Sequence, residues 1–111
     1  MTENIHEFID NIVKSNDVVL FMKGTAESPK CGYSAQVVKI LNYLGVDFLD
    51  VDIMASEDLR QGIKDYTDWP TTPQLYIKQE FIGGCDIVTE MFQNSELQQL
   101  LKIKNIKTSK S

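Results

Sequence analysis

Helix and strand patterns alternate along the chain, and this order limits its fold more than any other feature of the sequence. A first helix, capped by Thr2, is expected because apolar residues follow the spacing of one helix face: Ile5, Phe8, Ile9, Ile12 and Val13. Two short apolar runs, DVVLFMKG at 17–24 and VDFLDVDI at 46–53, are expected to form strands. A helix over residues 32–44 should separate them, with Gly45 as its C-terminal cap.

The second half of the chain continues the alternation and then closes with a hairpin. Ser56 is expected to cap a helix over residues 56–67, and QLYI and EFIGG read as two strands joined by a two-residue turn. Two short helices follow, capped by Asp86 and by Ser95, the latter in a capping box with Gln98. The order predicts an α/β protein with a four-stranded mixed sheet flanked by helices.

The composition is that of one soluble globular domain. Hydrophobic residues make up 42% of the chain, and no apolar run approaches the ~20 residues of a membrane span. The start of the chain lacks the pattern of a secretory signal, so we expect a cytoplasmic protein with reduced thiols and no membrane association. The net charge of −5 argues against a nucleic-acid groove. We expect a domain over residues 1–103 and a lysine-rich, disordered tail over residues 104–111.

Cys31 stands at the start of the helix expected over residues 32–44, a position that favours a reactive thiol. Free amide groups and the positive end of the helix dipole stabilise a thiolate there, and Lys23 and Lys30 place positive charge nearby. The position of Cys31 therefore indicates a nucleophile or a metal ligand.

Ser34 occupies the position at which a dithiol motif has its second cysteine. The mixed disulfide of Cys31 must then be resolved by an outside thiol or by Cys85, unless the thiol binds metal instead. Zinc sites take four ligands, iron–sulfur clusters commonly take four thiolates, and His6 is distant in sequence. One chain alone therefore cannot complete such a site at this loop.

Two further segments carry chemical signals. In WPTTP, Pro73 either begins a strand or forms a cis bond that presents the backbone of Thr72 to a ligand beside the thiol. In GGCD, Gly83 and Gly84 permit close approach of a ligand to a helix N-terminus. Asp86 reads most simply as the helix cap, and it could also receive an ammonium group.

Taken together, these segments resemble the monothiol glutaredoxins, which have a thioredoxin-like fold. The resemblance runs from about residue 3 to about residue 103 and is carried by FMKGT, PKCGYS, LRQGIKDYTDWPTTPQLYI and FIGGCDI, in that order. The family usually has C-G-F-S at the thiol and WPTIP in the loop, so Tyr33 and Thr72 are departures from its pattern. Tyr33 keeps the aromatic ring, and the contribution expected at residue 72 is mainly from its backbone.

The resemblance implies a role for each residue of the site. Cys31 would be the catalytic thiol and the metal ligand, bound to one iron of a [2Fe-2S] cluster that two subunits share. The thiol of one glutathione held by each subunit would complete the set of ligands. The glutathione contacts implied are with five positions: Lys23 and Arg60 for its carboxylates, Thr72 for its backbone, and Cys85 and Asp86 for its glutamyl end.

Three functional readings follow from this resemblance. The leading one is a carrier that accepts a [2Fe-2S] cluster and passes it to apo iron–sulfur proteins, as a homodimer or with a BolA-type partner. The second is an enzyme that reduces protein–glutathione mixed disulfides through Cys31, with glutathione as the resolving thiol. The third makes Cys85 a resolving thiol for Cys31, although Cys85 could equally be a small apolar residue at a packed turn.

Overall fold

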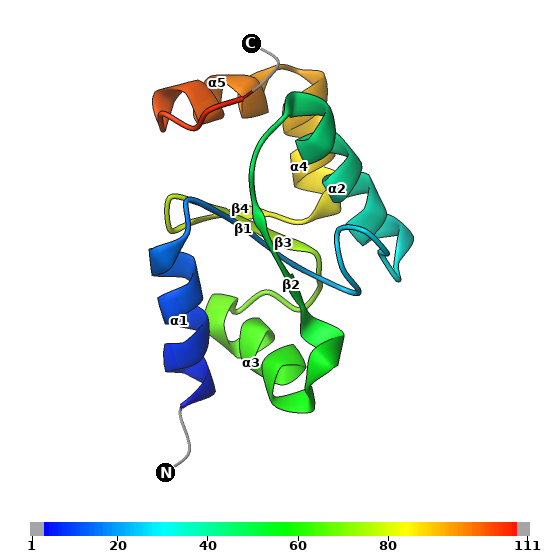
Figure 1. Ribbon diagram of the computed structural model, residues 1–111, viewed down its shortest axis with the longest axis vertical. Coiled ribbons are helices and arrows are strands. Elements are labelled where there is room, and N and C mark those ends of the chain that lie inside the picture. Colours follow the sequence, from blue (N-terminus) through cyan, green and yellow to red (C-terminus); the bar gives the residue numbers. More distant parts are fainter. Residues whose placement is uncertain (1–3, 109–111) are drawn as a thin grey trace.

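The computed structural model of the protein describes residues 4–108, in which helices and strands alternate as predicted (Figure 1). In chain order the elements are α1 (Ile5–Ser15), β1 (Val18–Met22), α2 (Gly32–Leu44), β2 (Leu49–Asp52), the 3-10 turn η1 (Ile53–Ala55), α3 (Glu57–Thr67), β3 (Gln74–Ile77), β4 (Glu80–Gly83), α4 (Cys85–Gln93) and α5 (Glu96–Ile103).

The strands form one mixed sheet in the order β2-β1-β3-β4. β1 runs parallel to β2 and antiparallel to β3, so that Leu20 pairs with Asp50 on one side and with Leu75 on the other. β3 and β4 form the predicted hairpin, and its turn residues Lys78 and Gln79 both have positive φ, as a tight hairpin turn requires. The predicted four-stranded mixed sheet flanked by helices is therefore confirmed.

Helices cover both faces of the sheet, and β1 supplies side chains to both layers. Alternate β1 residues Val18, Leu20 and Met22 pack with α2, α4 and α5, whereas Val19 and Phe21 pack with α1 and α3. Figure 1 shows these two groups of helices on opposite sides of the sheet. Because every residue of β1 is buried, its sequence is a continuous apolar run rather than an alternating one.

The helix ends match the sequence predictions in part. Gly45 ends α2 with a φ of 71°, and the Ser56 hydroxyl accepts the Leu59 N–H at 3.0 Å at the start of α3. The N-cap of α1 is Asn4, whose side chain accepts the His6 N–H at 2.8 Å. The cap predicted at Thr2 lies outside the described residues.

One cap prediction in the C-terminal part is wrong, and another is confirmed only for the position of the cap residue. α4 begins at Cys85 with Gly84 as its N-cap, so Asp86 lies in the first turn and does not cap the helix. Ser95 does stand at the N-cap of α5, but with a φ of 71° and without a side-chain cap bond. Asn94 accepts the Glu96 N–H instead, and Gln98 donates to the Phe92 carbonyl, so no capping box forms.

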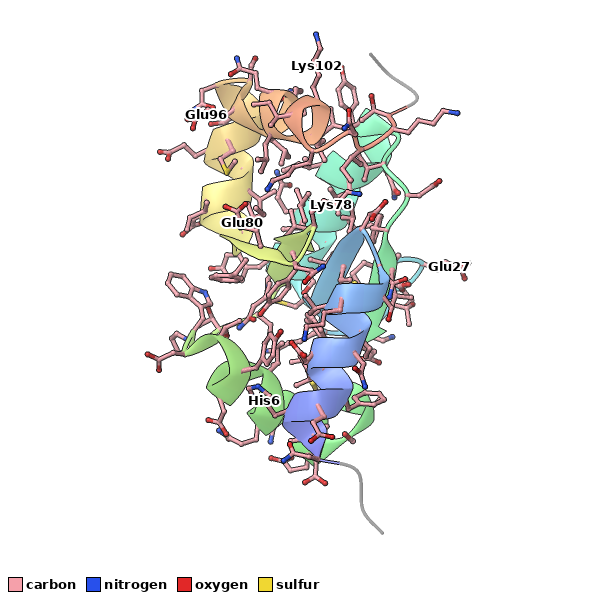
Figure 2. The ribbon with its side chains drawn as sticks, turned by 90° about the vertical axis from the view of Figure 1, so that its left-hand side faces the viewer. His6, Glu27, Lys78, Glu80, Glu96 and Lys102 are labelled. Carbon is pink, nitrogen blue, oxygen red and sulfur yellow. The ribbon has the colours of Figure 1, made fainter. Side chains whose placement is uncertain are left out.

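The segment that follows α5 contacts the domain through residues 104–106. The Lys104 ammonium lies 3.2 Å from a carboxylate oxygen of Glu80, which is on the hairpin. Glu80 is labelled in Figure 2. The Ile106 N–H donates to the Leu101 carbonyl at 2.8 Å, and the Ile106 side chain packs against the core between the sheet, α2, α4 and α5. Residues 109–111 of the predicted tail lie outside the described residues, and the boundary at residue 104 stays a prediction.

Candidate functional site

The residues predicted from the sequence as the site lie around one cleft of about 490 Å³. Its lining includes all six of them: Lys23, Cys31, Arg60, Thr72, Cys85 and Asp86. The cleft forms where several segments converge: the end of β1, the N-termini of α2 and α4, the exposed face of α3 and the 69–73 loop. Its volume is within the range of small-molecule sites, roughly 300–1,000 Å³.

Cys31 is the N-cap residue of α2, and its backbone is extended there. The Ser34 backbone N–H lowers the pKa of the Cys31 thiol most strongly. The Tyr33 N–H, the charge of Lys23 and the Ser34 hydroxyl add to this effect, whereas partial burial opposes it. The thiol is partly exposed and makes no side-chain cap bond, so it is accessible as a nucleophile or ligand.

Ser34 has a positive role that the sequence did not reveal. Its side chain is completely buried, and its hydroxyl accepts the Lys23 backbone N–H at 3.2 Å. The same hydroxyl contributes to the lowered pKa of Cys31. Ser34 therefore connects the first turn of α2, which begins at the thiol, to Lys23 at the end of β1, whose charge also lowers the pKa of Cys31.

Replacing Ser34 with alanine should move the titration of Cys31 to higher pH. A thiol with a lowered pKa is mostly thiolate above that pKa, so raising the pKa slows alkylation at lower pH and leaves it high at alkaline pH. The pH dependence of iodoacetamide alkylation, read at the Cys31 peptide by mass spectrometry, measures this. The loss of a buried hydrogen bond should also reduce the free energy of unfolding by about 1 kcal/mol. Ser28→Ala, in an exposed loop position, should leave both quantities unchanged, and an unshifted profile for Ser34→Ala would contradict the role.

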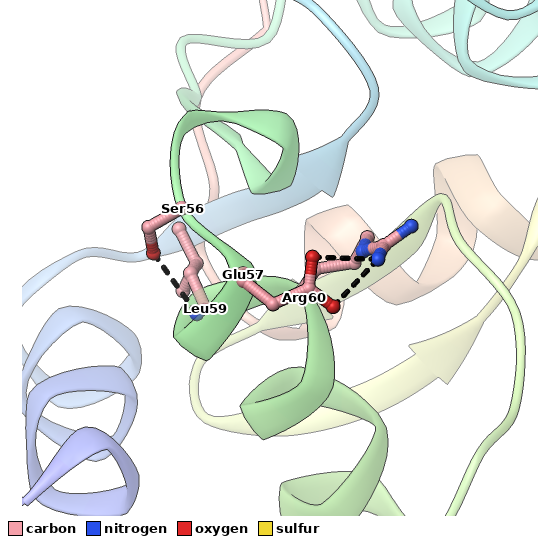
Figure 3. A network of polar contacts seen from close by, with 4 residues as sticks. All are labelled: Ser56, Glu57, Leu59 and Arg60. Carbon is pink, nitrogen blue, oxygen red and sulfur yellow. Dashed lines mark hydrogen bonds and ion pairs between the residues drawn. The ribbon is translucent and has the colours of Figure 1, made fainter.

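Positive charge gathers in the cleft although the protein as a whole is acidic. Lys23 lines it at the end of β1, Arg60 and Lys64 line it from α3, and Asp86 lies on the α4 side. In Figure 3, Ser56 caps α3 and one guanidinium nitrogen of Arg60 contacts both carboxylate oxygens of Glu57, each at 2.6 Å. This exposed pair leaves the rest of the guanidinium available, since an exposed ion pair is only weakly favourable in water.

The 69–73 loop is held in place by Gln74, the first residue of β3. The Gln74 side chain is fully buried, and its amide donates to the carbonyls of Trp69 at 3.2 Å and Thr71 at 3.1 Å. Its amide oxygen accepts from the Tyr76 hydroxyl at 3.4 Å. The Thr72–Pro73 bond is cis, which is one of the two alternatives that the sequence left open. The backbone of Thr72 is thereby presented at the cleft by a loop that is bonded to the sheet.

The N-terminus of α4 approaches this loop closely because residue 84 is a glycine. A Cβ on Gly84 would lie 3.2 Å from the Pro73 carbonyl oxygen. The Cys85 sulfur lies 3.9 Å from the Thr89 hydroxyl, one turn along α4. Cys31 and Cys85 are both free thiols.

A second, more open hollow of about 590 Å³ meets the cleft at Cys31, Cys85 and Asp86. It lies between α2 and α4, with Gln36 and Thr89 among its lining. Tyr33 and Ile87, which are 65% and 37% exposed, both line the first cleft, and Tyr33 lines the second hollow as well. The thiol therefore lies where the two hollows meet, in the same lining as these exposed apolar side chains.

Metal-binding capacity within the chain is small. Across residues 4–108, no group of three or more His, Cys, Asp and Glu side chains is placed to hold a metal ion. His6 lies where α1 packs on α3, with its ring 4.9 Å from that of Tyr66 (Figure 2). A metal that takes four ligands would thus need some of them from outside the chain.

Several residues of the site were missed by the sequence reasoning. Lys64 could have been found, because it lies four residues after Arg60 and therefore on the same face of α3. Ser34 and Gln74 could not, because their roles depend on burial and on partners in other segments. The acceptors Asp50 and Asp52 likewise bond to the loop before the thiol, which is far from them in sequence.

The sheet and the helices on both its faces define a thioredoxin-like protein, which has a cysteine at the N-terminus of α2 and a serine three residues later. The glutaredoxin family model matches residues 18–82. A relative from Rickettsia felis, described as a probable monothiol glutaredoxin, is 56% identical over 103 residues, which are 92% of this chain and 99% of that protein. The chain belongs to the glutaredoxin family, among its monothiol members.

Other comparisons agree with this assignment. The chloroplastic monothiol glutaredoxin-S14 of Arabidopsis thaliana is 52% identical over 99 residues, which are 89% of this chain and 57% of that protein. The solution structure of a truncated mutant of Trypanosoma brucei 1-C-Grx1 has a TM-score of 0.89 at 39% identity, covering 99% of this chain and 100% of that one. A buckwheat glutaredoxin–glutathione complex has a TM-score of 0.79 at 26% identity, covering 91% and 90% of the two chains.

None of the helices in residues 4–108 combines the length and the apolar character that crossing a membrane requires.

Proposed function

We propose that the protein binds glutathione in the cleft and carries a [2Fe-2S] cluster that it passes to apo iron–sulfur proteins. The observation that carries this proposal is the position of Cys31, a low-pKa thiol at the mouth of a cationic cleft, with buried Ser34 in place of a second cysteine. The cluster is cargo in this proposal, and the chain contributes one sulfur to it.

Glutathione fits the charges of the cleft. The tripeptide has two carboxylates and one ammonium group, and the lining offers Lys23, Arg60 and Lys64 for the former and Asp86 for the latter. The first turn of α4 offers backbone N–H groups to an anion beside Asp86. The glutathione complex of the related buckwheat glutaredoxin supports the same ligand class.

Sharing of the cluster between two subunits follows from the count of ligands. One Cys31 and one glutathione thiol per subunit make two ligands, and two subunits make the four that such a cluster commonly takes. Tyr33 and Ile87, which line the cleft together with Cys31, offer exposed apolar surface that a second subunit or a BolA-type partner would cover. A cytoplasmic location, where thiols stay reduced, would suit the free Cys31 and Cys85.

The lowered pKa of Cys31 favours a second candidate function, the reduction of protein–glutathione mixed disulfides. The Cys31 thiolate would attack the glutathione sulfur, and the protein thiolate would leave and take up a proton. A second glutathione thiolate would then attack the Cys31–glutathione disulfide, releasing oxidised glutathione and restoring the Cys31 thiolate. Because the glutathione sulfur is used either as an electrophile or as a ligand, both functions require the same cleft.

The deciding experiment is anaerobic reconstitution with iron, sulfide and glutathione, followed by visible absorption, circular dichroism and size exclusion. We expect charge-transfer bands on a dimer that becomes a colourless monomer when glutathione is removed. S-methylglutathione is the matched control, since it keeps the charges of the tripeptide and lacks a free thiol. It should not support the coloured dimer. A colourless monomer under every condition, with rapid turnover of a glutathionylated substrate, would contradict the carrier function and support the reductase function.

A further inference from the structure

The loop before the thiol is a compact unit attached to β2 by two carboxylates. Its base is closed by the Lys30 N–H, which donates to the Lys23 carbonyl at 2.9 Å, and Thr25 and Ser28 bond to each other within it. Asp52 accepts the Gly24 N–H at 3.0 Å, and Asp50 accepts the Ala26 N–H at 2.7 Å.

Asp52 has a second partner on the opposite wall of the cleft. The same oxygen, Oδ1, also accepts the Met54 N–H at 2.9 Å and so caps η1. Ile53 of η1 lines the cleft, and η1 leads directly into α3, which carries Arg60 and Lys64. One carboxylate oxygen therefore bonds to both the segment that leads to the thiol and the segment that leads to the cationic helix.

The thiol side of this connection is closely packed. Gly24 has a φ of 87°, and a Cβ there would lie 2.6 Å from the Ser28 carbonyl and 2.7 Å from the Lys30 nitrogen. Its neighbour Lys23 donates its N–H to Ser34 in the first turn of α2. A chain of backbone and side-chain bonds thus runs from Asp52 through Gly24 and Lys23 to the turn that begins at Cys31.

Asp50 provides the comparison. It is also partly buried and bonds to the same loop at Ala26, but it makes no hydrogen bond to η1 or α3. Neither Asp50 nor Asp52 lines the cleft itself. Any effect of Asp52 on a ligand must therefore act through the two walls that it joins.

We propose that Asp52 is a positioning residue that fixes the separation between the thiol and the cations of α3, and so selects a thiol ligand that spans them. The proposal rests on the proposed glutathione site. A tripeptide with its sulfur at Cys31 and a carboxylate at Arg60 or Lys64 needs the two walls at the correct separation. A small thiol bound only through its sulfur does not.

The experiment compares Asp52→Ala, Asp52→Asn and Asp50→Ala with the wild type. Each is equilibrated with oxidised and reduced glutathione, in which the Cys31 thiol and oxidised glutathione give the Cys31–glutathione disulfide and one reduced glutathione. A parallel series uses the 2-mercaptoethanol couple, whose disulfide lacks carboxylates. Mass spectrometry gives both equilibrium constants, and their ratio measures the preference for the tripeptide.

We expect Asp52→Ala to lower this preference roughly tenfold, with the 2-mercaptoethanol equilibrium unchanged within about twofold. Asp52→Asn keeps an oxygen acceptor and should retain the preference, as should Asp50→Ala. Unchanged preference in Asp52→Ala, or equal loss in Asp50→Ala, would overturn the proposal. A loss in Asp52→Asn equal to that in Asp52→Ala would assign the effect to charge and would also overturn it.

Amide hydrogen exchange separates this inference from the function on which it rests. Asp52→Ala should speed exchange at both Gly24 and Met54 and in the first turn of α3, whether or not a ligand binds. If the wild type shows no preference for glutathione, the proposed glutathione site fails. In that case the exchange data alone test whether Asp52 couples the two walls. Faster exchange at only one wall would overturn the coupling, and faster exchange at both would support it.

Discussion

Replacing Cys31 with serine should abolish mixed-disulfide formation with glutathione and leave the reconstituted protein colourless. The reason is that the proposed function assigns both the nucleophile and the iron ligand to this thiol, and a serine hydroxyl is neither ionised near neutral pH nor a comparable ligand for iron. The fold should be unaffected. Cys31 makes no cap bond at the N-terminus of α2, and serine is a favoured N-cap residue, so the free energy of unfolding should stay the same or rise by up to about 1 kcal/mol.

Cys85→Ser is the matched control, because it removes the other thiol of the same cleft. The Cys85 sulfur lies 3.9 Å from the hydroxyl of Thr89 on its own helix, a contact that serine can approximate. We expect this variant to form the Cys31–glutathione disulfide and to take up the cluster as the wild type does. Absorption at reconstitution and intact mass after treatment with oxidised glutathione measure both properties. If Cys85→Ser lost them as completely as Cys31→Ser, Cys85 would belong to the thiol chemistry and the one-thiol account would be wrong.

The sequence predicted the fold and the composition of the cleft well, for a physical reason. Burial patterns along β1 and α2 are local in the chain, and the alternation of helices and strands allows few arrangements of a small mixed sheet. In those arrangements the end of β1 and the start of α2 are joined by one short loop, which places Lys23 near Cys31.

The parts that could not be predicted are polar contacts between distant segments. The bond from Gly24 to Asp52 joins residues 28 positions apart, and no local pattern distinguishes Asp52 from other acidic residues of an edge strand. The cap at Asp86 was predicted wrongly for a related reason. The glycine before Cys85 already provides the extended N-cap conformation, which shifts the helix start and places the carboxylate in the first turn, facing the cleft.

Replacing Gln74 with methionine should both destabilise the protein and weaken its preference for glutathione. Methionine has a similar length and can fill the buried position, but it cannot donate to the carbonyls of Trp69 and Thr71. Leaving two carbonyls and the Tyr76 hydroxyl without this partner should reduce the free energy of unfolding by about 2–4 kcal/mol, measured in urea. Because Thr72 lies in the released loop, the glutathione preference should fall as well.

Tyr76→Phe distinguishes a loop effect from a general loss of stability. It removes the 3.4 Å bond to the Gln74 oxygen and leaves both bonds from Gln74 to the loop in place. We expect Tyr76→Phe to lower the free energy of unfolding by about 1 kcal/mol and to keep the ratio of the glutathione and 2-mercaptoethanol equilibrium constants. If the ratio fell in both variants in proportion to their loss of stability, the Gln74 amide would stabilise the fold without a separate role in glutathione recognition. If only Gln74→Met lost it, the backbone of Thr72 must be held by Gln74 for the tripeptide to be recognised.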